Sequence, residues 1–366
     1  MSSLIMHIVG NRPQFIKLAP VSKAIRARGY REVIIHSGQH YDENMSDVFF
    51  DELGIAKPER NLHISGGTHA EMTAKMMLAL EPVMLEFAPD VVILYGDTNT
   101  TLAAALTAAK LNIPVVHVEA GPRTGNMRNP EEVNRVIVDR ISALLCAPDE
   151  SSMQNLIREN LQGKAVFSGD VMYDTFLSNR ERINGSQVLE NYSLAEGQYI
   201  LMTWHRQENT SDRESMLQII ELLEAIPYRI VCPLHPRTEK MLQQFGLWER
   251  AVAIRNLLMI EPVGYIEMVA LLSGCRMTLT DSGGLSKESF FAEVKCLFML
   301  DLSVWPELEQ SEWILHKAED IETNLAVINN VFSRPKQSEE RPAFYGNGNA
   351  AGTIVKEMEN RFHLTK

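Results

Sequence analysis

The sequence contains little cysteine. Four residues, Cys146, Cys232, Cys275 and Cys296, are spread over 366 positions without a Cys-X-X-Cys pair. Three of them fall in apolar, strand-like runs, so we expect buried thiols in a reducing compartment rather than disulfides or a metal site. Long apolar runs are also absent. None approaches the roughly 20 residues of a membrane-spanning helix, and the N-terminal stretch lacks the basic start of a signal peptide. These absences predict a cytoplasmic protein without a membrane partner.

The sequence has no excess of basic residues either. Lysine and arginine together number 35 against 47 aspartates and glutamates, which gives a net charge of −12. An acidic chain repels the phosphates of nucleic acids and the head groups of anionic membranes. We therefore expect neither as a partner, and an anionic ligand must be held by individual Arg, Lys and His side chains.

Common ligand-binding motifs are missing as well. There is no Gly-X-X-X-X-Gly-Lys-Ser/Thr motif, no Gly-X-Gly-X-X-Gly after the first strand-like run, no Gly-X-Ser-X-Gly and no zinc-type Cys/His spacing. These absences argue against P-loop phosphate transfer, a tightly bound dinucleotide, a serine-hydrolase nucleophile and a zinc centre.

What is present is a regular alternation of apolar, β-branched runs with amphipathic segments. This βαβ pattern predicts parallel sheets covered by helices on both faces. In the first half we expect strands at Leu4–Val9, Glu32–His36, Val91–Tyr95, Pro114–Glu119, Ala143–Ala147 and Ala165–Ser168, with helices at Ala19–Arg28, Thr101–Lys110 and Ser151–Leu161.

The alternation lapses at a polar stretch, Asn184–Gly197, and then restarts. A chain of 366 residues exceeds what one core usually supports, so the lapse predicts a linker between two doubly wound α/β domains. Ligands of such sheets bind beyond the strand carboxyl ends, so we expect the domains to face a cleft. In the second half we expect strands at Tyr199–Trp204, Arg229–Pro233, Met277–Thr280 and Cys296–Leu300, and helices near Glu214–Glu224, Glu267–Leu272 and Ser286–Ala292.

Charged and small residues follow the predicted strands in both halves. Single members have simple explanations: Asp97 before Thr98 suits a helix N-cap, and His117 between two valines suits a hydrogen-bonded core histidine. The convergence of the whole set on strand ends nevertheless predicts a binding site. The set comprises Arg12, Lys17, Gln39, His40, Asp42, Asp97, Thr98, His117, Glu119 and Arg123, then His205, Arg206, Glu208, His235, Arg237 and the stretch TDSGG.

The stretch TDSGGLSKE, residues 280–288, joins a strand end to small residues and a helix start. Small residues let a ligand approach the backbone, and a helix N-terminus offers N–H groups to an anion. In the first half Glu131 and Glu132 open a helix, where the helix dipole explains one acid, and the second suggests a side chain pointing into the cleft.

These residues fit a nucleoside diphosphate whose sugar faces Asp97, Glu119 and Glu131, because carboxylates act as acid and base at carbon while cations stabilise a departing pyrophosphate. Two classes remain from the residues alone: a nucleotide-sugar glycosyltransferase, and an enzyme that rearranges the sugar of a nucleotide sugar.

The chain resembles the non-hydrolysing UDP-N-acetylglucosamine 2-epimerases, including the branch that acts on UDP-2,3-diacetamido-2,3-dideoxyglucuronate. The matching motifs run in family order from residue 10 to about residue 350. They are GNRPQFIKLAPV, SGQHYDENM, YGDTNTTLAAALTA, HVEAGPRT, PEEVNRVIVDRIS, WHRQEN, HPRT, EPVGYIEMV, TLTDSGGLSKE and YGNGNA.

The resemblance implies a GT-B-like fold of two Rossmann-like domains, with the last helix crossing back to the first. By this resemblance residues 1–170 form the domain with the catalytic acids, residues 171–350 form the UDP-binding domain, and residues 351–366 form the returning helix. It also implies a homodimer, although the sequence itself does not reveal the oligomeric state.

The implied reaction is epimerisation at C2 of UDP-N-acetylglucosamine. UDP leaves by anti elimination as the C2 proton is removed, and it adds back to the 2-acetamidoglucal as the proton returns on the other face, giving UDP-N-acetylmannosamine. No cofactor and no metal are needed. Matched by position, the catalytic residues are Asp97, Glu119, Glu131 and His205. The residues matched to substrate and UDP binding are Arg12, Lys17, Arg135, His235, Arg237, Tyr265, Ser282, Gly283, Gly284 and Glu288.

The sequence departs from the family pattern near the expected diphosphate. Ser286 and Lys287 stand where Gln and Glu are usual, the segment LDLSVWPE (residues 300–307) lacks the usual Arg, and Asn347 replaces an Asp. Trp305 is similar to the diacetamido-glucuronate branch, so that substrate is an alternative. Further alternatives are a GT-B glycosyltransferase using a UDP-sugar, a hydrolysing relative, and a protein that binds a UDP-sugar without turnover.

Some members of the family are activated by their own substrate at a second site. Gln39, His40 and Arg206 match positions used there, but residues 68–72 match poorly, so we expect this regulation to be absent or weakened. The resemblance also implies a role in making surface polysaccharides such as capsule or O-antigen.

Overall fold

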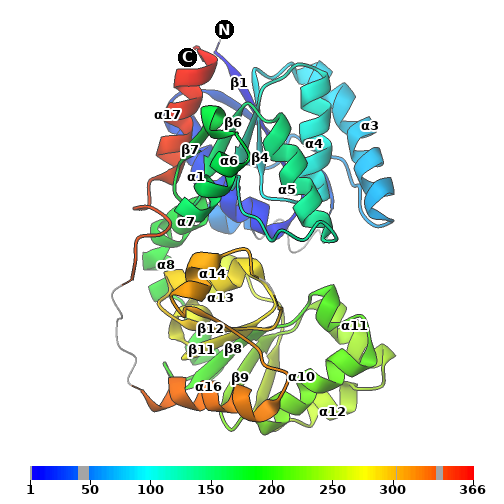
Figure 1. Cartoon of the computed structure of the whole chain (residues 1–366), viewed down its shortest axis with the longest axis vertical. Helices are drawn as coiled ribbons and strands as arrows, with labels where there is room; N and C mark the ends of the chain where they lie inside the picture. Colours follow the sequence, from blue (N-terminus) through cyan, green and yellow to red (C-terminus); the bar gives the residue numbers. More distant parts are fainter. Residues whose placement is uncertain (1, 40–48, 302, 335–340) are drawn as a thin grey trace. The chain divides into compact units, whose positions relative to one another are not determined.

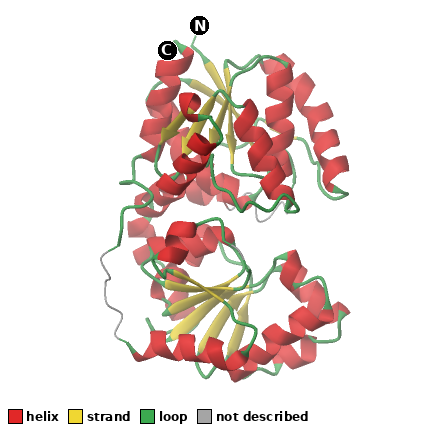
Figure 2. Cartoon of the chain, viewed as in Figure 1, coloured by secondary structure: helices red, strands yellow, loops and turns green. Residues whose placement is uncertain are grey.

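The structure, a computed structural model, describes residues 2–39, 49–301, 303–334 and 341–366. Its described residues form two compact units (Figure 1), of which unit 1 comprises Met1–Ser178 with Ala343–Lys366 and unit 2 comprises Asn179–Pro342. Each unit is an open parallel sheet with helices packed on it (Figure 2). The predicted α/β class with two doubly wound sheets is confirmed.

The described part of unit 1 contains a seven-stranded sheet in the order β3-β2-β1-β4-β5-β6-β7, paired in parallel. Every residue of β1 and β4 is buried, as expected for apolar strands covered on both faces. The strands are β1 (Leu4–Val9), β2 (Arg31–His36), β3 (Arg60–Asn61), β4 (Val91–Tyr95), β5 (Val115–Val118), β6 (Leu144–Ala147) and β7 (Ala165–Phe167).

The helices of unit 1 begin at residues suited to capping. Asn11, Thr98 and Asn129 each accept a hydrogen bond from a first-turn N–H, which satisfies donors that the helix itself leaves without partners. The helices are α1 (Arg12–Ala27), α3 (His69–Phe87), α4 (Asn99–Lys110), α5 (Pro130–Ile141), α6 (Glu150–Arg158), α7 (Val171–Ser178) and α17 (Ala350–Phe362).

The last helix, α17, packs against α1 and α7 of unit 1, so the predicted return of the C-terminal helix is confirmed. The Asp174 carboxylate accepts the N–H groups of Ala350 (3.0 Å) and Ala351 (2.8 Å) at the start of α17. The Asp170 N–H donates to the Tyr345 carbonyl oxygen at 3.0 Å. These contacts hold residues on both sides of unit 2 to unit 1, which is why the division falls at Ser178 and Ala343 instead of after residues 170 and 350.

The described part of unit 2 contains a six-stranded sheet in the order β10-β9-β8-β11-β12-β13, also paired in parallel. Its strands are β8 (Tyr199–Thr203), β9 (Arg229–Pro233), β10 (Leu257–Ile260), β11 (Met277–Thr280), β12 (Lys295–Phe298) and β13 (Ile314–His316). Its helices are α8 (Arg180–Asn184), α9 (Val188–Asn191), α10 (Arg213–Ala225), α11 (Pro236–Gln244), α12 (Trp248–Val252), α13 (Tyr265–Gly274), α14 (Gly283–Phe291), α15 (Pro306–Gln310) and α16 (Ile321–Ser333).

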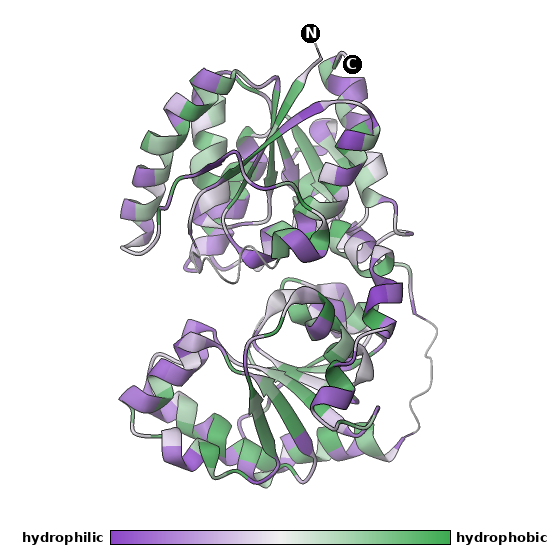
Figure 3. Cartoon of the chain, turned by 180° about the vertical axis from the view of Figure 1, so that it is seen from behind, coloured by the Kyte–Doolittle hydropathy of each residue, from purple (hydrophilic) through white to green (hydrophobic). Residues whose placement is uncertain are grey.

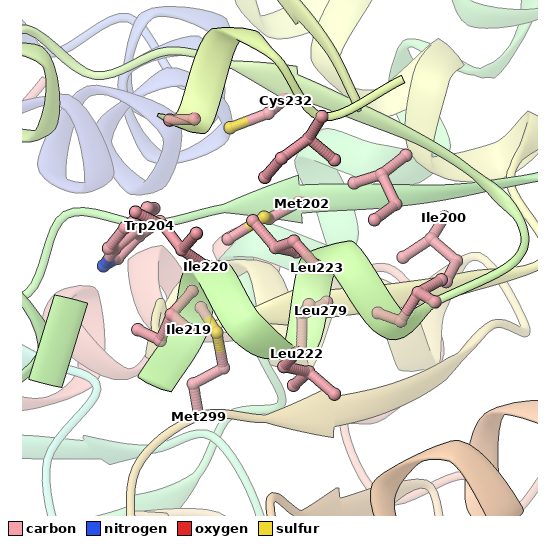
Figure 4. Packing of buried hydrophobic residues seen from close by; sticks show 14 of the residues in the cluster. Ile200, Met202, Trp204, Ile219, Ile220, Leu222, Leu223, Cys232, Leu279 and Met299 are labelled. Carbon is pink, nitrogen blue, oxygen red and sulfur yellow. The ribbon is translucent and has the colours of Figure 1, made fainter. Parts of the chain in front are cut away.

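One face of the unit 2 sheet carries an apolar core (Figure 4). Met202 on β8 and Leu279 on β11 lie in one cluster with Ile219, Ile220 and Leu223 of α10, and each is almost fully buried. Burying an aliphatic side chain of this size stabilises the fold by about 1.5–3 kcal/mol. Figure 3 shows the same pattern throughout, with hydrophobic strands inside each unit and hydrophilic residues on the helices around them.

The polar stretch Asn184–Gly197 was predicted to be a linker, and this prediction is wrong in part. It contains α9, and both α8 and α9 pack against α13 in unit 2. The apolar residues Val188 and Leu189 were outnumbered by polar neighbours in the sequence, yet Val188 is buried and Leu189 lies close to Gly274.

The sequence pattern also missed β3, β10 and β13. They have two, four and three residues, and most of these residues are only partly buried. None of the helices described here is long and apolar enough to cross a membrane. All four cysteines are buried thiols, as their apolar surroundings predicted, and burial raises the pKa of Cys232 to about 12.

Candidate functional site

Each sheet has a point at which the strand order reverses, and the sequence-predicted residues gather there. In unit 1 it lies between β1 and β4, and in unit 2 between β8 and β11. Loops leaving adjacent strands diverge to opposite faces at such a point, which opens space for a ligand beyond the strand carboxyl ends.

In unit 1, Lys17 and Glu119 form a close ion pair. The distance from Lys17 Nζ to Glu119 Oε1 is 2.5 Å, and both side chains are almost buried. Glu119 follows β5 with φ of +68°, a left-handed conformation that is uncommon for a glutamate and typical of residues held in place at functional sites. Lys17 was predicted to face the diphosphate, and the structure gives it a carboxylate partner within unit 1.

Asp97 is held by two residues of α5. Its Oδ2 lies 2.6 Å from Arg135 Nη2, and its backbone carbonyl accepts from Asn134 Nδ2 at 2.8 Å. Asp97 was considered as the N-cap of the next helix, but Thr98 is that cap. Burial alone would lower the pKa of Arg135, yet the charges of Asp97 and Glu132 raise it above its usual value. Arg135 is therefore a fixed cation beside Asp97.

Glu131 and Glu132 have different environments. Glu132 is buried and accepts the N–H groups of Thr124 (3.0 Å) and Gly125 (2.9 Å) as well as an Arg135 N–H. Burial raises the pKa of Glu132, but these hydrogen bonds outweigh it and lower the pKa below its usual value. Glu132 thus fixes the loop before α5, and Glu131 is the partly exposed acid of the pair.

The remaining predicted residues of unit 1 line the loops after β1 and β2. The Arg12 guanidinium lies 4.3 Å from the centroid of the Phe49 ring. Gln39 accepts from the Thr100 hydroxyl at 2.7 Å, so this predicted regulatory residue has an internal partner. His40 and Asp42 lie outside the described residues.

In unit 2, Asp281 holds the loop that carries His205 and Arg206. The fully buried Asp281 carboxylate accepts the N–H groups of His205 (3.0 Å) and Arg206 (2.9 Å), and its Oδ1 lies 3.3 Å from His205 Nδ1. Asp281 was predicted only as part of the stretch TDSGG and was given no role of its own. The sequence pattern nevertheless indicated a special position for Asp281, because a carboxylate between an apolar strand and a helix cap is either buried with partners or functional.

His205 stacks on His235, with ring centroids 5.2 Å apart. His235 also caps α11, since its Nδ1 accepts the Arg237 N–H at 3.1 Å. Arg237 Nε donates to the Thr210 hydroxyl at 2.9 Å. The structure thus brings His205, His235 and Arg237 together at the ends of the neighbouring strands β8 and β9.

The start of α14 presents backbone N–H groups. The Ser282 side chain caps the helix by accepting the Leu285 N–H at 3.3 Å. A Cβ added to Gly283 would meet no atom within 4 Å. The helix starts at Gly283, whereas the sequence pattern predicted a start at Ser286. Its first turn is open at Gly283 and suits an anion. Tyr265, at the start of α13, and Glu288, within α14, are both buried.

Trp305 fills the neighbourhood in which the usual Arg is missing. Its indole N–H donates to the Gly283 carbonyl oxygen at 3.0 Å. The ammonium of the buried Lys287 lies 3.8 Å from the centroid of the Trp305 ring. The altered segment thus supports the first turn of α14, and Lys287 places a cation near it. Within the described residues, no cluster of His, Cys, Asp and Glu is arranged to hold a metal ion.

Comparison with known proteins gives one consistent result. Residues 23–359 match the sequence model of a family described as UDP-N-acetylglucosamine 2-epimerase. The chain is 41% identical over 358 residues to the UDP-N-acetylglucosamine 2-epimerase homolog of Methanococcus maripaludis, covering 97% of this chain and 99% of the relative. It is also 41% identical over 363 residues to the UDP-2,3-diacetamido-2,3-dideoxy-D-glucuronate 2-epimerase of Pseudomonas aeruginosa, with coverage of 97% and 99%.

Solved structures of similar shape agree. The Methanocaldococcus jannaschii UDP-GlcNAc 2-epimerase in complex with UDP-GlcNAc and UDP superimposes with a TM-score of 0.90 at 35% identity, covering 98% of this chain and 99% of that chain. The Neisseria meningitidis UDP-GlcNAc 2-epimerase bound to UDP-GlcNAc gives a TM-score of 0.87 at 28% identity, with coverage of 98% and 100%.

Proposed function

The chain belongs to the UDP-N-acetylglucosamine 2-epimerase family, and on that premise we propose that it interconverts UDP-N-acetylglucosamine and UDP-N-acetylmannosamine. The observation that carries the proposal is the pairing of two acids with two fixed cations at the strand ends of unit 1. Glu119 is paired with Lys17, and Asp97 is paired with Arg135. Each acid is therefore held in a fixed position beside a cation, and carboxylates act as acid and base in proton transfer at carbon.

In the proposed reaction, Asp97, Glu119 and Glu131 manage the C2 proton of the sugar. One acid removes this proton while the C1–O bond to UDP breaks, and the bonding electrons leave with the diphosphate. The 2-acetamidoglucal then takes UDP back at C1, and a proton is delivered to the other face of C2. Atoms and charge balance without a redox step, so the proposal includes no cofactor and no metal.

The leaving diphosphate needs positive charge and N–H donors. In unit 2 we assign this role to His205, His235, Arg237 and the N–H groups of Gly283 and Gly284. A helix N-terminus with an open first turn stabilises an anion by its dipole and its unsatisfied N–H groups. Asp281 supports this role because it fixes the His205–Arg206 backbone. Arg12, Tyr265, Ser282 and Glu288 complete the proposed substrate-binding set.

A second substrate has specific support. The Pseudomonas relative, named for UDP-2,3-diacetamido-2,3-dideoxy-D-glucuronate, is as similar to this chain as the Methanococcus relative. Trp305 and Lys287 alter the neighbourhood of α14 and add a cation to it. The same elimination and re-addition on this acidic sugar nucleotide is the alternative to UDP-N-acetylglucosamine.

Proton NMR of the enzyme with UDP-N-acetylglucosamine in D2O tests the proposal. We expect loss of the C2 proton signal and appearance of the manno epimer. Exchange only with the diacetamido-glucuronate nucleotide would keep the reaction and change the substrate. A glycosyltransferase would show no C2 exchange without an acceptor, and a hydrolysing relative would accumulate UDP. Silence on both substrates would contradict the proposed reaction.

We further propose that the enzyme is a cytoplasmic homodimer that supplies sugars for surface polysaccharides. The dimer is supported by helix α3, where Ala74, Leu78, Pro82 and Leu85 are exposed on one helix face. Leu78 is 75% exposed and Leu85 is 64% exposed. An apolar stripe of this length on a surface helix suits a contact with the same stripe of a second copy.

A further inference from the structure

The histidine of the stretch HVEAG is buried behind the two proposed catalytic acids. His117 lies on β5 and is fully buried, and so is Asp139 of α5. His117 Nδ1 is 2.6 Å from Asp139 Oδ1, and His117 Nε2 is 2.7 Å from the carbonyl oxygen of Gly96. Both ring nitrogens therefore face oxygen atoms.

The partners of this ring decide where its protons lie. A carbonyl oxygen only accepts hydrogen bonds, so His117 Nε2 carries a proton. The second oxygen of Asp139 accepts from the Gly121 N–H at 3.1 Å and faces Arg123 Nη2 at 2.7 Å. Both of these groups are donors, so that oxygen carries no proton.

One proton therefore remains to be placed between Asp139 Oδ1 and His117 Nδ1. Arg123 places a positive charge beside the carboxylate, and burial of Asp139, which raises its pKa, is outweighed by His117 and Arg123, which lower it. That proton forms the hydrogen bond that joins the two side chains. Two further charged groups face the cluster: Glu159 binds Arg123 at 2.7 Å, and Lys164 donates to the backbone carbonyl of Asp139 at 2.8 Å.

The bond to Gly96 links this pair to the acids. Gly96 directly precedes Asp97, and its N–H donates to the Val118 carbonyl oxygen at 3.0 Å, one residue before Glu119. A Cβ added to Gly96 would lie 3.2 Å from Lys17 Nζ and 3.6 Å from Glu119 Oε1. The Gly96 peptide is thus next to the Lys17–Glu119 pair and next in sequence to Asp97.

We propose that the hydrogen-bonded pair of His117 and Asp139 fixes the Gly96 peptide and so positions Asp97 and Glu119. The inference rests on the proposed epimerase function, because it assigns His117 and Asp139 as positioning residues for that reaction. Carboxylate–histidine pairs serve the same purpose behind other active groups, where they fix ring orientation and protonation. Neither side chain reaches solvent, so neither is proposed to touch the substrate.

The hydrogen bonds of the pair can be measured without substrate. In the full chain labelled with 15N-histidine, comparison with His117→Gln assigns the His117 signals. We expect His117 Nε2 to carry a proton that is held by the Gly96 carbonyl oxygen. In Asp139→Asn the amide can donate to Nδ1 and still accept from Arg123, so the ring should keep its Nε2–H bond to Gly96. A His117 ring without a proton on Nε2 in the unaltered protein would overturn the proposal.

The positioning role is tested by kinetics. His117→Gln should lower kcat for C2 exchange by about 100-fold, the size expected for displaced catalytic groups, with KM unchanged. Asp139→Asn should retain more kcat because it keeps the Gly96 bond. Cys146→Ala is the control: it removes a buried side chain on β6, paired beside β5, without touching the pair, and its kcat should stay within about twofold.

The outcomes separate this inference from the proposed function. If the unaltered enzyme exchanges no C2 proton with either substrate, the proposed function fails, while the NMR measurement still decides whether His117 holds the Gly96 carbonyl oxygen. If the unaltered enzyme is active and His117→Gln keeps its kcat, the positioning role is wrong. Equal losses in Asp139→Asn and His117→Gln would likewise contradict a role that acts through the Gly96 bond.

Discussion

Lys17 Nζ on α1 lies 2.5 Å from Glu119 Oε1 after β5, although the two residues are separated by 102 positions in the sequence. Both side chains are about nine-tenths buried. Removing one member of such a pair leaves a buried charge without its partner, which costs about 3–5 kcal/mol. The pair therefore has a structural and a catalytic role, and the two can be separated experimentally.

Lys17→Met and Glu119→Gln should each lower the free energy of unfolding, by about 3 kcal/mol for the lysine variant, which leaves the carboxylate charged. The double variant should recover part of that stability, because neither charge remains. C2 exchange should stay abolished in every variant that lacks Glu119. Urea unfolding measures the first effect and NMR in D2O the second. Full exchange in Glu119→Gln would remove Glu119 from the mechanism.

The second prediction concerns the stability of the fold at acidic pH. His36 packs beside the rings of Phe15 and Phe50, and its Nδ1 accepts the Gly38 N–H at 2.9 Å. Burial lowers the pKa of His36 to about 4 from its usual 6.5. Between these two values the unfolded chain binds the proton and the folded chain does not, so stability falls as the pH drops from 6.5 toward 4.

By linkage this single group should remove about 2 kcal/mol of stability by pH 5. His36→Asn lacks the titrating ring, so its unfolding free energy should fall less between pH 7 and pH 5 than that of the unaltered protein. Urea unfolding at the two pH values provides the comparison. Parallel pH dependences in both proteins would show that His36 is not the group responsible.

The sequence predicted most of the strands that are buried along their whole length, because a continuous apolar run between polar segments is visible in the pattern. It also placed Lys17, Asp97, Glu119, His205 and Ser282 at strand ends. It could not show which side chains form ion pairs. The Lys17–Glu119 and Arg135–Asp97 contacts depend on strand order, which is set by packing over the whole chain. Glu119 was expected as the last residue of a strand, yet it lies beyond β5 with a positive φ.

Asp281 shows a second limit. Its place between an apolar strand and a helix cap was visible in TDSGG, but its partners are 75 and 76 residues away in the sequence. The same holds for His117. The sequence was consistent both with a core histidine and with a site residue, and its partners are fixed only by the fold.

The third prediction addresses the proposed dimer. Leu78→Glu with Leu85→Glu places two charges on the exposed face of α3, so the protein should become monomeric in light scattering. Val252→Glu is the control, because Val252 is 54% exposed on α12 of unit 2. That variant should keep the mass of the unaltered protein. A monomer before any substitution would contradict the proposal directly.

The fourth prediction concerns regulation by substrate. Gln39 is engaged with Thr100 at 2.7 Å, and the Arg206 N–H donates to Asp281. The Gln39 side chain thus has an internal partner, and residues 68–72 match the family poorly, so we expect weak or no activation. The initial rate of C2 exchange should rise hyperbolically with substrate concentration. Sigmoidal rates, together with no activity on the pure manno epimer, would show that substrate activation is present.

The last prediction uses the open first turn of α14. Because a Cβ at Gly283 would meet no protein atom within 4 Å, Gly283→Ala should leave the free energy of unfolding unchanged or slightly higher. If the diphosphate occupies that space, the added methyl group must displace it. We expect UDP to bind about tenfold more weakly by calorimetry, a loss of about 1.4 kcal/mol. Gly163→Ala is the matched control, since its Cβ would also meet open space in unit 1. Unchanged UDP affinity in Gly283→Ala would place the diphosphate away from this helix, and the anion site would then have to be sought at His205, His235 and Arg237.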